Sequence, residues 1–95
     1  MSWKAEAHKI YEARMVKEAL AKLAGRVDLK TLPFSEEELH TLAKRARESF
    51  RGRERNRERF DKYKAHLSAI HGKEIVETIS IALVEINNAL GYEEK

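Results

Sequence analysis

The chain has 95 residues, of which 37% are charged and 42% are hydrophobic, and its formal net charge at pH 7 is +3. This length fits a single domain, and a composition with one proline, four glycines and many helix-forming residues predicts an all-α fold. The absence of cysteine excludes disulfides and thiolate metal sites and favours a cytoplasmic location. No apolar run resembles a secretory signal or reaches the ~20 residues that span a bilayer, so we expect no membrane contact.

The first half of the chain predicts two helices and an apolar connector. Apolar residues recur every three or four positions from Trp3 to Leu23, and a glycine follows, so we expect a helix over about 3–24. The connector RVDLKTLPF is rich in apolar residues and should fold back over the core. Ser35 and Glu38 then have the spacing of a capping box, which predicts a second helix from residue 36.

Between Phe50 and Phe60 the apolar spacing is interrupted. A single helix over 36–71 would be about 54 Å long, whereas a compact domain of this size is about 30 to 35 Å across. Gly52 also disfavours a helix interior. We therefore predict a break near residues 51–54, with helices over 36–51 and 54–71. A continuous helical arm is the alternative, because pairs of glutamate and arginine would support helix through the gap.

The last segment predicts a helix over 73–90 that follows a glycine at position 72. Ile81 and Val84 extend its apolar surface beyond one face, so it lies either at the centre of a bundle or against a second copy. We expect a small antiparallel bundle of three to four helices within one domain, residues 1–95, that forms a homo-oligomer, such as a homodimer, through this C-terminal helix.

Basic residues are concentrated between positions 44 and 64, where ten basic side chains accompany four acidic ones. The planar fork of arginine matches phosphate geometry, so the favoured function is non-enzymatic binding to the backbone of RNA or DNA. The alternatives are an adaptor or inhibitor that docks on an acidic protein surface, and a solvated surface neutralised by its own carboxylates. The candidate binding residues are Lys44, Arg45, Arg47, Arg51, Arg53, Arg55, Arg57, Arg59, Lys62 and Lys64.

No pattern in the chain predicts a catalytic, cofactor-binding or metal site. The four histidines lack the i, i+4 spacing of a helical zinc pair, and no serine has a base at a suggestive spacing. Glu37 and His40 match one Glu-x-x-His step of di-iron bundles, but their place in the first helical turn is explained by capping. We therefore expect no enzyme, no cofactor and no metal.

The stretch RFDKYKAH, from Arg59 to His66, resembles the active-site motif of the HEPN family, four-helix ribonucleases that use an arginine and a histidine at a dimer seam. The resemblance covers eight residues, and Phe60 stands where that family prefers a polar residue. It implies a ribonuclease as a third alternative. Without that function, His66 is expected to edge the core beside Leu67.

Overall fold

The computed structural model describes residues 3–49 and 54–91, and for residues 3–10 it describes the backbone only. The elements are α1 (Trp3–Ala24), a short 3-10 helix η1 (Leu29–Thr31), α2 (Glu36–Glu48), α3 (Glu54–His71) and α4 (Lys73–Leu90). The described residues contain no strand, which confirms the all-α prediction. None of the described helices is long and apolar enough to cross a membrane.

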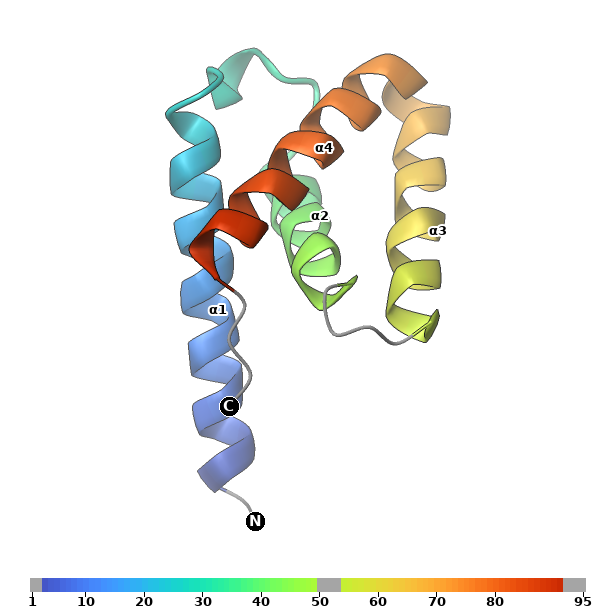
Figure 1. The fold of residues 1–95 in the computed structure, drawn as a ribbon. Helices are drawn as coiled ribbons and strands as arrows, with labels where there is room; N and C mark the ends of the chain where they lie inside the picture. The colour runs from blue at the N-terminus through green and yellow to red at the C-terminus, as the bar shows by residue number, and fades with distance from the viewer. Residues whose placement is uncertain (1–2, 50–53, 92–95) are drawn as a thin grey trace.

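The four helices are arranged so that α2 and α4 lie between α1 and α3 (Figure 1). From the end of α3, α4 runs diagonally across the molecule towards α1 (Figure 1). The first turns of α1 extend past the ends of the other helices in the same view. The molecule measures 41 × 28 × 24 Å along its principal axes.

Each helix contributes to one shared core. Leu23, Leu42, Leu67 and Leu83, one from each α-helix, are fully buried. The connector between α1 and α2 also contributes, because Phe34 is buried in the core and other apolar side chains of the connector pack against it. The prediction that this connector folds back over the core is confirmed.

The start of α2 is fixed by the predicted capping box. Ser35 Oγ accepts a hydrogen bond of 3.0 Å from the backbone N–H of Glu38, and Glu38 Oε1 accepts one of 2.9 Å from the backbone N–H of Ser35. These two bonds satisfy donors that the first helical turn leaves without an intrahelical partner. The local sequence therefore determines where α2 begins.

The basic segment is divided between two helices that pack against each other. α2 ends at Glu48, earlier than the predicted residue 51, and α3 begins at Glu54 as predicted. Residues 50–53, including the predicted break at Gly52, lie outside the described residues. The alternative of a continuous helical arm is wrong, because both helices bury apolar side chains, Ala46 of α2 and Phe60 of α3 among them, in the same core.

A single residue, Gly72, connects α3 to α4. Its backbone has φ 105° and ψ 141°, a conformation that L side chains rarely adopt. Glycine is therefore required by the backbone and not by a lack of space, since a Cβ at this position would have no neighbouring atom within 4 Å. This residue sets the direction in which α4 leaves α3.

Candidate nucleic-acid interface

Four of the predicted binding residues, Arg55, Arg57, Arg59 and Lys62, are exposed on α3. At 100° per residue, Arg55, Arg59 and Lys62 fall within about 60° of one another around the helix, whereas Arg57 points about 160° away from Arg59. Arg55 and Lys62 are about 10 Å apart along the axis. We call Arg55, Arg59 and Lys62 the arginine stripe.

The three side chains of this stripe are exposed to solvent. Within the described part of the chain, none of the three side chains forms an ion pair with a carboxylate, although Glu54, Glu58 and Asp61 lie on the same helix. Lys44 of α2 is likewise exposed and makes no ion pair among these residues. Glu58 nevertheless stands next to Arg59 and four residues before Lys62, so the alternative of a surface neutralised by its own carboxylates stays open.

Two other candidate residues are engaged within the molecule. Arg45 Nη1 lies 3.3 Å from Glu48 Oε1, and Lys64 Nζ lies 3.3 Å from Asp61 Oδ1. The Lys64 ammonium also lies 4.3 Å from the centroid of the Phe60 ring. Since these pairs join residues three apart on a helix surface, they are weak, and either cation remains able to exchange its partner.

Arg47 is buried, with only 1% of its surface exposed. Its guanidinium carbon lies 5.6 Å from the centroid of the Tyr11 ring, in the geometry of a cation–π contact between α2 and α1. The prediction of Arg47 as a binding residue does not fit this burial. Arg47 follows the buried Ala43 by four residues, so it lies on the core face of α2, and this spacing is the sequence signal that could have identified it.

Arg51 and Arg53, two of the arginines predicted to contact a ligand, lie outside the described residues. A continuous helical arm would have placed Lys44 and Lys62 on one ridge, and no such ridge forms because α2 and α3 are separate helices. Of that ridge, the structure retains the stripe on α3.

His66 extends the arginine stripe by one further turn. It is exposed, and it lies about 20° around the helix from Arg59 and about 10 Å along it. The expectation that His66 edges the core is therefore wrong, and its ring instead lies 5.9 Å from the Tyr63 ring, centroid to centroid. Arg59 and His66 are thus presented on the same face of α3.

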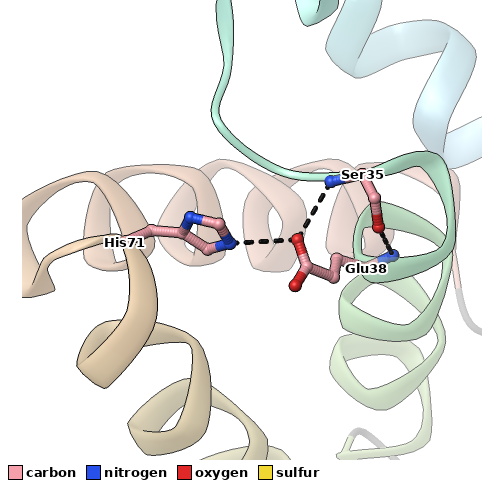
Figure 2. A network of polar contacts seen from close by, with 3 residues as sticks. All are labelled: Ser35, Glu38 and His71. Atoms are coloured by element: carbon pink, nitrogen blue, oxygen red, sulfur yellow. Dashed lines mark hydrogen bonds and ion pairs between the residues drawn. The ribbon is translucent and has the colours of Figure 1, made fainter.

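A separate polar network joins the start of α2 to the end of α3 (Figure 2). His71 Nε2 lies 3.0 Å from Glu38 Oε1, the same oxygen that accepts the bond from the Ser35 amide. The Phe34 ring meets the His71 ring edge-on at 4.9 Å between centroids. The Ser35 amide and the His71 ring lower the pKa of Glu38 below its ordinary value of 4.5, although burial acts in the opposite direction.

This network is a structural clamp between helices. Glu38 is held as a carboxylate by hydrogen bonds to its charged form, and no group of three or more potential metal ligands occurs among the described residues. Sequence reasoning assigned Glu38 to the cap but missed its contact with His71, because the two residues are 33 positions apart.

Comparison with known proteins does not assign the chain to a family, since no protein-family model, no curated protein and no solved structure matches it.

Proposed function

We propose that the protein binds the phosphate backbone of RNA or DNA through the arginine stripe on α3, without catalysing a reaction. The observation that supports this proposal is the exposure of Arg55, Arg59 and Lys62 without a carboxylate partner among the described residues. Guanidinium groups in such a position can contact phosphate oxygens through two parallel hydrogen bonds. Contacts of this kind hold a nucleic acid in place but do not read its sequence.

Salt dependence provides the test. If the stripe contacts three phosphates, raising the salt concentration from about 50 mM to about 200 mM should weaken binding about 20- to 40-fold through release of counterions. Fluorescence anisotropy with labelled RNA and DNA oligonucleotides of mixed sequence measures this change. Absence of binding to any of these oligonucleotides at the lower salt concentration would contradict the proposal.

A matched pair of triple variants locates the binding surface. Arg55→Glu combined with Arg59→Glu and Lys62→Glu should abolish binding, because it reverses the charge of the stripe. The control is Arg14→Glu combined with Lys17→Glu and Lys22→Glu, which changes the net charge equally at three exposed positions of α1. Equal loss of affinity in both triple variants would indicate a non-specific effect of net charge.

An acidic surface on a partner protein is the alternative ligand for the same stripe. Two results together would indicate this alternative. The wild type would capture a protein partner that the triple variant of the stripe does not capture, and the wild type would not bind the oligonucleotides. The presentation of Arg59 and His66 on one face of α3 keeps a HEPN-like ribonuclease as a third candidate. Hydrolysis of RNA that disappears in His66→Ala would identify that activity.

We further infer that the chain self-associates through α4, that its helices follow one another in antiparallel succession, and that it functions in the cytoplasm. Self-association is supported by the exposure of the large apolar side chain of Ile81 on α4. The cytoplasmic location is supported by the absence of cysteine alone.

A further inference from the structure

A groove of about 320 Å³ opens between α3 and α4. Phe60 of α3 and Val76 of α4 line it and are buried in the core. Val84 is half-buried, and Ile81 has 54% of its surface exposed. The groove therefore leads from solvent to the core along an apolar path. Ile81 lies on its α4 side, and the large apolar side chain of this residue is exposed to solvent.

The charged residues that line the groove are separated by helix. Lys64 lies on the α3 side, whereas Glu77 and Glu85 lie on the α4 side. A further lysine, Lys73, stands at the end nearest to the connection between the two helices, where its flexible side chain can extend into solvent. The α3 wall thus carries one positive charge, at Lys64, and the α4 wall carries two negative charges beyond its first residue.

We propose that this groove is the interface at which a second copy of the chain binds. A face-to-face dimer with two-fold symmetry presents the same surface from both copies, so the surface must be complementary to itself. When the two-fold axis runs along the groove, α3 of each copy faces α4 of the other, and Lys64 of each copy faces the carboxylates Glu77 and Glu85. When the axis runs across the groove, α3 faces α3 and like charges meet.

Charge complementarity therefore favours the dimer whose two-fold axis runs along the groove. In this arrangement Ile81 of each copy faces the α3 wall of the other, where Phe60 and the exposed Ala65 lie. The existing partners of the charged residues do not prevent it. Glu85 pairs with Arg26 at 3.0 Å in an exposed ion pair, and such pairs are weak enough to exchange.

The size of this face predicts a weak dimer. The two helices have 18 residues each and are about 27 Å long, and a face of two such helices side by side, about 20 Å wide, is an upper limit because α4 runs diagonally away from α3 (Figure 1). The resulting area of about 500 Å² is smaller than the roughly 800 Å² per partner of a standard stable interface. We therefore expect a monomer–dimer equilibrium with a dissociation constant in the micromolar range or weaker.

Charge reversal on each wall tests the arrangement. Sedimentation velocity from about 10 μM to about 1 mM should show the wild-type equilibrium. Lys64→Glu alone, and Glu77→Lys combined with Glu85→Lys, should each weaken association at least about tenfold, because like charges then face each other. An equimolar mixture of the two variants should recover a dimer, since both contact regions of the mixed dimer are complementary again.

Ile81→Gln is a second, charge-neutral variant that should also weaken association, and its exposed position leaves the core unchanged. The control is Lys17→Glu combined with Glu18→Lys, at exposed positions of α1, which should associate as the wild type does. Circular dichroism checks that each variant retains its helices.

The proposal is overturned by a wild-type chain that stays monomeric over the whole range of concentration. It is equally overturned by a dimer that the groove variants do not weaken, or by variants whose mixture does not associate. This inference specifies the self-association proposed above, and it is independent of nucleic-acid binding, which Glu77→Lys combined with Glu85→Lys should not reduce. Failure of one proposal therefore leaves the other intact.

Discussion

At the scale of single residues, the face of the helix decides what an arginine does. Arg47 and Arg59 belong to the same basic segment, but the first is buried against Tyr11 and the second is exposed. A buried arginine contributes through the packing of its long side chain as well as its charge. An exposed one contributes little to stability, and its side chain is accessible to solvent.

Alanine substitutions should separate these two roles. Arg47→Ala removes buried atoms and should lower the free energy of unfolding by about 2 to 4 kcal/mol. Arg59→Ala should change it by less than about 0.5 kcal/mol and should instead weaken binding to oligonucleotides. Urea denaturation and fluorescence anisotropy measure the two quantities. Similar losses of stability in both variants would contradict the assignment of Arg47 to the core and Arg59 to the surface.

The clamp formed by Ser35, Glu38 and His71 predicts a dependence of stability on pH. The pKa of Glu38 is lower in the folded state than its ordinary value of 4.5, so the folded state favours the carboxylate. The stability from this residue is therefore present above about pH 4.5 and is lost as the pH falls through the folded pKa. Glu38→Gln should destabilise the protein near neutral pH, and this effect should shrink as the pH falls below 4.5, so that it is smaller near pH 3.

Thermal denaturation of the wild type and Glu38→Gln at the two pH values measures this difference. Glu36→Gln is the control, because Glu36 is exposed in the same helical turn. The control should show a smaller change between the two pH values. If Glu38→Gln destabilises the protein equally at both, the effect does not arise from the carboxylate charge.

At the scale of elements, the direction of α4 depends on Gly72. Its positive φ is strained for any residue with a side chain, even though the space around it is open. Gly72→Ala should therefore lower the free energy of unfolding by about 1 to 3 kcal/mol, as measured by urea denaturation. Lys73→Ala, at the neighbouring exposed position, is the control and should be close to neutral. A neutral Gly72→Ala would show that the connection adopts another backbone conformation.

The elements themselves could be predicted because their signals are local. The capping box at Ser35 and the glycines after α1 and before α4 lie within a few residues of the helix ends that they mark. The contact between Glu38 and His71 could not be predicted in this way, because it joins the ends of two helices. The groove between α3 and α4 depends on the angle between the helices, which helical periodicity does not specify.

The candidate site was predicted only in part, for the same reason. The concentration of positive charge in residues 44–64 is a property of composition, and among its members the structure shows Arg55, Arg59 and Lys62 exposed on one side of α3. Which of these basic side chains face outward depends on the division of the segment between α2 and α3, because each helix buries one of its sides. A count of charge along the chain does not distinguish Arg47, which lies on the core face of α2, from the exposed arginines.

At the scale of the whole molecule, the two surfaces proposed for α3 do not overlap. The arginine stripe occupies one side of the helix, whereas Phe60 and Lys64 of the groove lie about 100° and about 140° around it from Arg59. A dimer formed through the groove would therefore leave both stripes exposed. Two linked binding surfaces bind a long strand more tightly than one does, because the second contact becomes intramolecular.

This geometry predicts a dependence on the length of the nucleic acid. A long oligonucleotide offers more binding sites than a short one, which by itself raises its apparent affinity. At protein concentrations that populate the dimer, the wild type should prefer an oligonucleotide long enough to reach both stripes by a factor larger than the ratio of these numbers of sites. Ile81→Gln leaves the net charge and the stripe unchanged but should weaken the dimer, so its preference for the long oligonucleotide should fall to that ratio. Fluorescence anisotropy with both lengths, at one salt concentration, measures the two preferences. An equal preference in the wild type and in Ile81→Gln would mean that the two stripes do not act together, whichever surface joins the copies.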